Sequence, residues 1–267
     1  MLKFGKRLLA LAAAAVLMCP TTAFGATPEE AQAYLEQVMT QTNSSMDDIN
    51  AFYDLDIGIS GDMLTELGID PITMRMEMNL KANHLQDPSQ LKYMAYYRIT
   101  DQTGEQMTGT MYLTDGYMYS DTLGTKTKMK MEAGTDLNVE LLPTDLNDMS
   151  MDMIKDVSIR QEGEDTVVSY SMDAAKFNQF MMDFMGLTGM EAEFADAGIT
   201  MSFGNLDGEY VLNSQGQLIK IRMDIAMDMG ISGENLHITM KGDVGIADPG
   251  QPVEVPMPNP AEYTEIQ

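Results

Sequence analysis

Cysteine, histidine and tryptophan are almost absent from the 267-residue sequence, which has one Cys, two His and no Trp. The single Cys is Cys19, close to the N-terminus, so no disulfide can support the rest of the chain. His84 and His237 both fit solvated side chains better than general bases. The motifs G-x-S-x-G, H-E-x-x-H and the P-loop do not occur. The sequence therefore predicts a protein that is not an enzyme and needs no cofactor.

Basic residues are also scarce, because 16 Lys and Arg face 41 Asp and Glu and the net charge is −25. A surface with this charge repels the phosphate backbone of nucleic acids and anionic lipid headgroups. We therefore expect no nucleic-acid partner, and we interpret the acidic surface as an aid to solubility.

Long apolar runs are missing after the first 25 residues, which have the pattern of a secretory signal peptide. Lys3, Lys6 and Arg7 precede the apolar run Leu8–Met18, and Ala23-Phe24-Gly25 provides the small residues of a cleavage site. The run has 11 residues, whereas a membrane-spanning helix needs about 20. We expect cleavage before Ala26, and an extracellular or cell-surface protein of residues 26–267.

Cys19 supports an alternative interpretation of this segment. A Cys directly after the apolar run can be the lipidated N-terminus of a bacterial lipoprotein, although Met18 stands where the lipobox has Gly, Ala or Ser. Only lipidation at Cys19 would attach the protein to a membrane.

The mature chain begins with the signature of a helix. Thr27-Pro28-Glu29-Glu30 combines an N-cap, a Pro at the first helical position and a capping-box Glu. An apolar stripe at helical spacing follows, and the polar stretch 40–50 predicts a loop. The stripe consists of Ala31, Tyr34, Leu35, Val38 and Met39.

Strict alternation of apolar and polar residues then predicts β-strands. The clearest example is 72–82, where every even position is apolar and every odd position is polar. The same pattern recurs around residues 91–99, 107–113, 126–131, 157–159, 168–172, 219–229 and 236–246. Asp115-Gly116 and similar turn sequences join these segments, so neighbouring strands should be antiparallel.

A second helix is predicted after Asp173, with an apolar stripe that ends before Gly186. Shorter helices are expected around 144–154 and 190–197. The resulting fold class is mainly β, with nine to eleven strands in a long, curved antiparallel sheet, or half-open barrel, wrapped around a few helices. We expect a single domain over 26–267, with a hint of two similar halves at about 26–150 and 151–267.

The segment Asn205-Leu206-Asp207-Gly208-Glu209 is faintly similar to a calcium loop. It lacks the spacing and the terminal Glu of an EF-hand, so we interpret it as a turn before a strand. No other metal site is expected from the acidic residues.

Methionine is the unusual abundance, with 28 residues in the chain. Three interpretations remain open: Met as filler of the core, a deformable apolar pocket for a ligand, or capture of Cu(I) by thioethers. Most Met lie on the apolar face of a predicted strand, which favours the first two. The copper interpretation depends mainly on the run Met149, Met151 and Met153.

Taken together, the signal peptide, the N-terminal helix and the long alternating strands broken by helices resemble the LolA/LppX-like fold. The tail Val253-Glu254-Val255-Pro256-Met257-Pro258, followed by Ala261-Glu262-Tyr263, is similar to the tail of exported LolA-like proteins of Gram-positive, clostridial-type bacteria. The resemblance covers the mature chain. It implies a half-open β-barrel without enzymatic activity, whose concave apolar face shelters an acyl chain or another hydrophobic ligand.

The first functional hypothesis is therefore an exported protein that binds a lipid or another hydrophobic small molecule. The residues expected to contact the ligand are Met74, Met76, Met78, Met111, Met129, Met131, Met223, Met227 and Met240 on the strands, and Phe177, Phe180 and Phe184 on the helix. The alternative is a cell-surface interaction or structural module without a small ligand, which requires an apolar patch on the outer side of the sheet.

Overall fold

The computed structural model describes residues 27–45, 47–85, 87, 90–131, 151–188, 194, 198–231 and 233–266. Cys19 and the whole predicted signal peptide, residues 144–150 of the helix predicted around 144–154 and, apart from Phe194, the helix predicted at 190–197 lie outside these residues. So do Met149 and the side chain of Met151 from the copper hypothesis. The described end of the helix predicted around 144–154, residues 151–154, is a 3-10 turn followed by the start of a strand.

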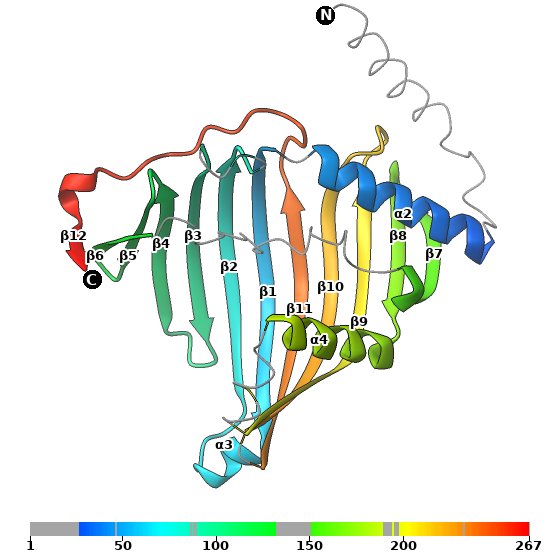
Figure 1. Ribbon diagram of the computed structural model, residues 1–267, viewed down its shortest axis with the longest axis horizontal. Coiled ribbons are helices and arrows are strands. Elements are labelled where there is room, and N and C mark those ends of the chain that lie inside the picture. The colour runs from blue at the N-terminus through cyan, green and yellow to red at the C-terminus, as the bar shows by residue number, and fades with distance from the viewer. Residues whose placement is uncertain are drawn as a thin grey trace, which may run out of the picture.

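Twelve strands of the described part of the chain form one curved, open sheet (Figure 1). Their order across the sheet is β12-β6-β5-β4-β3-β2-β1-β11-β10-β9-β8-β7, so β1 near the N-terminus lies beside β11 near the C-terminus. All pairs are antiparallel except β12 with β6. The strands are β1 (Ile49–Gly61), β2 (Ile72–Asn83), β3 (Lys92–Asp101), β4 (Gln106–Thr114), β5 (Tyr117–Thr122), β6 (Thr125–Lys130), β7 (Ile154–Glu162), β8 (Asp165–Met172), β9 (Ile199–Leu212), β10 (Leu218–Ile231), β11 (Glu234–Ile246) and β12 (Thr264–Ile266).

This architecture confirms the predicted fold class. The number of strands exceeds the prediction, and the alternating segments predicted from the sequence do not include β1, β5, β9 or β12. Of these, β1 joins β2 to β11. Its apolar residues Ile49, Ala51, Tyr53 and Leu55 alternate with Asn50, Phe52 and Asp54, so Phe52 interrupts the pattern that is regular in β2. The division into two similar halves stays a prediction.

The helices are α2 (Pro28–Ser45), α3 (Asp62–Glu66) and α4 (Ala174–Thr188), with short 3-10 helices η2 (Met151–Met153) and η3 (Pro260–Glu262). The predicted capping box at the start of α2 is confirmed: the Thr27 amide donates to the Glu30 carboxylate at 2.9 Å, and the Glu30 amide to the Thr27 hydroxyl at 3.3 Å. Asp173 caps α4 through the amides of Ala175 and Lys176. None of the helices in the described part of the chain combines the length and the hydropathy that a membrane span requires.

Two predicted helix ends were wrong. The polar stretch from Thr40 was expected to be a loop, but α2 continues to Ser45. Polar residues are compatible with a helix when earlier turns are already fixed by packing, as Leu35 and Val38 are here. Gly186 was expected to end the second helix, but α4 passes through it to Thr188, because a Gly inside a helix costs only about 1 kcal/mol.

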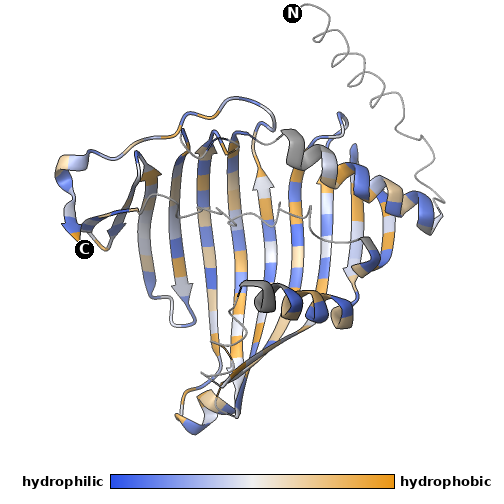
Figure 2. Ribbon diagram, viewed as in Figure 1, coloured by the Kyte–Doolittle hydropathy of each residue, from blue (hydrophilic) through white to orange (hydrophobic). Residues whose placement is uncertain are grey.

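We call the side of the sheet on which α2 and α4 lie the inner face and the opposite side the outer face (Figure 1). Figure 2 shows apolar and polar residues alternating along the strands, as two-faced strands require. The core lies on the inner face beneath α2. Its fully buried residues include Leu35, Ile49, Leu80, Leu212, Val168 and Val244.

Two tyrosine rings on the inner face lie across a glycine of the neighbouring strand. Gly208 is the Cα partner of Tyr170, and a Cβ built on it would collide with the tyrosine ring. Gly109 and Tyr97 repeat this arrangement in β4 and β3. Tyr170 also stacks on Tyr210, with the ring centroids 5.3 Å apart, so its ring has little room to move.

We therefore expect Gly208→Ala to lower the free energy of unfolding by about 1–3 kcal/mol, the usual cost of overpacking. Urea denaturation measures this. Gly245→Ala is the matched control, because the nearest atom to its new Cβ lies 3.9 Å away and Ala restricts the unfolded chain. Equal stability of the two variants would contradict the assigned packing.

Candidate functional site

The inner face changes from buried to half-buried along its four central strands, β2, β1, β11 and β10. On β1, Ala51 and Leu55 are buried, whereas Ile57 and Ile59 are only half-buried. The same change follows Leu80 on β2, Val244 on β11 and Ile221 on β10, in each case with distance from α2. Apolar side chains thus continue beyond the part of the sheet that α2 covers.

We call this half-buried region the methionine face. Cross-strand pairs place its members on one side of the sheet, because directly paired residues share a face. Ile57, for example, pairs with Met74 on one side and with Met240 on the other. The methionine face consists of Ile57, Ile59, Ile72, Met74, Met76, Met78, Met223, Ile225, Met227, Ile238 and Met240.

Six of the nine strand methionines predicted to contact a ligand thus lie together, on three of the four adjacent central strands. Met111, Met129 and Met131 lie apart from them, on β4 and at β6. From β6 to β10 there are seven inter-strand spacings, or about 34 Å at about 4.8 Å each. The nearest of the three, Met111 on β4, is two spacings, or about 10 Å, from β2, so only an elongated ligand could contact it together with the other six.

The sequence reading overlooked the isoleucines among these methionines. Ile57 and Ile59 belong to the missed strand β1, and Ile225 and Ile238 stand directly opposite methionines of the predicted set. The signal that could have found them is the alternation itself, because it selects positions on a face and not residue types.

Helix α4 borders the methionine face at β9. The Asn178 side chain donates to the backbone carbonyl of Phe203 at 2.9 Å and accepts from its amide at 2.7 Å. The ring of Phe177 meets that of Phe203 edge to face, 4.9 Å between centroids, and Phe180 is half-buried beside it. The side chain of Phe184 lies outside the described residues.

No basic side chain lies on the inner face of the four central strands. Their Lys, Arg and His residues all belong to the outer face by register, namely Arg75, Lys81, Lys220, Arg222, His237 and Lys241. An anionic group on the methionine face would therefore lose its hydration without gaining a counter-charge. The chemistry available here is apolar contact with an uncharged molecule.

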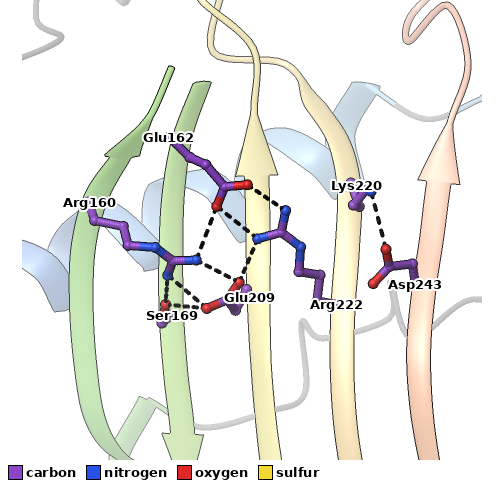
Figure 3. A network of polar contacts seen from close by, with 7 residues as sticks. All are labelled: Arg160, Glu162, Ser169, Glu209, Lys220, Arg222 and Asp243. Atoms are coloured by element: carbon purple, nitrogen blue, oxygen red, sulfur yellow. Dashed lines mark hydrogen bonds and ion pairs between the residues drawn. The ribbon is translucent and has the colours of Figure 1, made fainter. Parts of the chain in front are cut away.

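The outer face carries its charges in a network across β7, β8, β9 and β10 (Figure 3). Glu209 is its centre: it accepts from Arg160 Nη1 at 2.7 Å, from Arg222 Nη1 at 2.9 Å and from the Ser169 hydroxyl at 2.9 Å. Arg222 Nη2 also pairs with Glu162 at 2.9 Å. Segment 205–209 was interpreted as a turn before a strand, and this was wrong because it lies within β9.

These contacts lower the pKa of Glu209 to about 2. The main cause is the hydrogen bond from Arg160, followed by those from Arg222 and Ser169, against the opposing effect of partial burial. A carboxyl group whose pKa is lower in the folded protein stabilises the fold above its ordinary pKa of 4.5. That contribution disappears as the pH falls from about 4.5 towards about 2.

We expect Glu209→Gln to lower the Tm at pH 7 and to flatten the pH dependence of stability between about pH 4.5 and pH 2. Thermal unfolding followed by circular dichroism across this range measures both effects. Glu105→Gln, an exposed carboxylate outside the network, is the control and should change neither. An unchanged pH profile in Glu209→Gln would contradict the network's role.

Two shallow grooves of the outer face lie at the edges of this charged region. The larger has a volume of about 660 Å³ and is lined by Ser158, Ser171, Asp207, Arg222 and Lys241, among others. The second, of about 450 Å³, lies over β1 and β2 and shares Lys241. In the described ranges, no group of three or more His, Cys, Asp or Glu residues could hold a metal ion.

Comparison with known proteins gives a family and two distant structures. The model of a family of unknown function, DUF6612, matches residues 34–259. No curated protein matches the sequence. Solved structures that match include a DUF1329 family protein from Desulfovibrio piger, with 9% identity, TM-score 0.24 and coverage of 82% of this chain and 93% of the other.

A β-barrel-like protein of the domain of unknown function DUF1849 from Brucella abortus also matches. It has 10% identity and a TM-score of 0.28, and the match covers 75% of this chain and 98% of the other. With scores this low, neither structure informs on function.

Proposed function

This chain belongs to the family of unknown function DUF6612, and from the geometry of its sheet we propose that it binds an uncharged hydrophobic ligand, a lipid or an acyl chain, on the methionine face. The observation that carries the proposal is the continuation of apolar side chains on four adjacent strands beyond the buried core to which α2 contributes. A ligand on this face would remove from water the apolar side chains that the described helices leave half-buried.

The dimensions and side chains of the methionine face suit such a ligand. From Met78 to Ile72 the β2 strand extends about 20 Å at about 3.4 Å per residue, enough for an extended acyl chain. Each CH₂ group that leaves water contributes about 0.8 kcal/mol. Met side chains are unbranched and polarisable, so they can adapt to ligands of different shape.

Within this proposal the protein is an exported, LolA/LppX-like carrier with a half-open barrel. The support is the signal-peptide pattern of residues 1–25 and the resemblance of the strand and helix order described above. The curved open sheet with helices on its inner face is compatible with this assignment.

A double substitution tests ligand binding. Met76→Asp with Met227→Asp places two carboxylates on the methionine face, where a bound apolar molecule would desolvate them. We expect the affinity for the uncharged fluorescent probe N-phenyl-1-naphthylamine to fall about tenfold or more. Fluorescence titration measures this.

The matched control is Thr73→Asp with Ala226→Asp, which adds the same charges to the same strands on the outer face. It should bind the probe like the wild type. Circular dichroism must show that both variants are folded. Equal binding by two folded variants, or no binding by the wild type, would exclude the methionine face as the site.

A surface interaction module is the second candidate, and one observation favours it. Phe52 and Tyr96 lie on the outer face on either side of Asn79, with 50% and 38% of their surface exposed. Phe52→Ser with Tyr96→Ser should then abolish binding to the surface of the cells that produce the protein, measured by cell fractionation. It should leave probe binding unchanged, and retained cell binding would rule this candidate out.

A further inference from the structure

Strand β7 forms one edge of the sheet. It pairs with β8 along one edge, and in the described part of the chain no strand pairs with its other edge. The opposite edge is covered: after β11 the chain crosses the ends of the strands, and β12 pairs with β6 (Figure 1). Open edge strands offer unpaired N–H and C=O groups to another strand. One edge of the sheet thus ends in the three-residue strand β12, whereas the other ends in the nine-residue strand β7, which has no second strand partner among the described residues.

The sequence of β7 is complementary to itself in one antiparallel register. If two copies pair about a twofold axis through Ser158, Asp156 of each stands opposite Arg160 of the other on the outer face. Val157 then stands opposite Ile159 on the inner face. Both kinds of cross-strand pair are favourable, by about 0.2–1 kcal/mol each.

The other symmetric registers lose the two Asp–Arg pairs, and an axis through Gln161, which pairs Arg160 with Glu162, aligns only the end of β7. A twofold axis perpendicular to the sheet keeps each side chain on its own face. Directly paired residues must then share a face, so the axis has to lie between the two copies of one residue. An axis through Asp156 or Arg160 places identical charges opposite one another. An axis through Ile159 places Asp156 opposite Glu162 and loses both Asp–Arg pairs.

The two charged residues can accept such a partner. Asp156 is exposed and has only long contacts, 3.9 Å to Lys155 and 3.4 Å to the Ser171 hydroxyl. Arg160 uses Nη1 and Nη2 in the Glu209 network, while its Nε has no hydrogen-bond partner among the described residues. The bulge between Ile154 and Asp156 limits the regular ladder to the segment from Asp156 onwards.

We propose that two copies of this chain associate through antiparallel β7–β7 pairing centred on Ser158, which joins their sheets into one. Charged side chains of one sign, most often lysines, commonly protect an edge strand against pairing. The charges of β7 instead alternate in sign about Ser158, and the register centred there is the one that pairs opposite charges across the middle of the strand. The inner faces of both copies remain on the same side of the joined sheet. The pairing involves only the edge of β7, which is separate from the methionine face, so it does not depend on the proposed ligand.

A cysteine at the axis tests the register directly. Paired residues in an antiparallel ladder have Cα atoms about 4.5–5.5 Å apart, within the range that a disulfide bridges. In a Cys19→Ser background of the full chain, Ser158→Cys should form a disulfide-linked dimer under mild oxidation. Non-reducing electrophoresis measures it. Ser202→Cys, exposed on the outer face of β9, should remain monomeric.

Charge at the axis provides the second test. Ser158→Lys brings two like charges together and should weaken the dimer about tenfold or more, and Ser158→Glu should do the same. A mixture of these two variants should recover the dimer. Light scattering after size exclusion measures the masses. Ser202→Lys should dimerise like the wild type.

A wild-type protein that is monomeric at every concentration would overturn the proposal. So would a dimer that Ser158→Lys does not weaken, because its interface would lie elsewhere. Equal disulfide formation by Ser158→Cys and Ser202→Cys would indicate random collision and would also count against β7 pairing.

Discussion

The structure depends on one constraint: a long antiparallel sheet has to remove an apolar face from water with few helices. Along β1, β2, β10 and β11 the inner residues are apolar from one end to the other. The core cluster to which α2 contributes Leu35, Val38 and Met39 also includes Leu80 and Val244, and α4 borders the far part at β9. The methionine face between them is half-buried, and this incomplete burial is the basis of the proposed function.

The outer face satisfies the opposite requirement. Its carboxylates and basic groups pair across neighbouring strands, with Glu209 bound to two arginines from different strands. Single exposed ion pairs contribute little, but shared bidentate contacts hold several strands in register. Because the central strands keep every basic residue on this side, the residues of the methionine face offer no counter-charge to an anionic ligand. The selectivity expected for an uncharged ligand therefore follows from the same alternation that forms the sheet.

Much of the fold could be predicted from local pattern, and the rest could not for physical reasons. Alternation identified β2, β10 and β11, and capping identified the starts of α2 and α4. The end of α2 depends on tertiary packing, which local polarity does not encode. The distribution of the nine methionines over central and outlying strands, and the role of Glu209, depend on which strands become neighbours. Strand order arises from contacts far apart in the sequence, such as β1 with β11.

Native mass spectrometry of the protein purified from the cells that produce it tests the central claim most directly. If the methionine face is completed by a ligand, the spectrum should show a reproducible additional mass, and solvent extraction should release an uncharged lipid or acyl compound. A protein of bare mass, unchanged after incubation with lipids, would contradict the account. Its methionines would then serve only to fill the interior of the sheet.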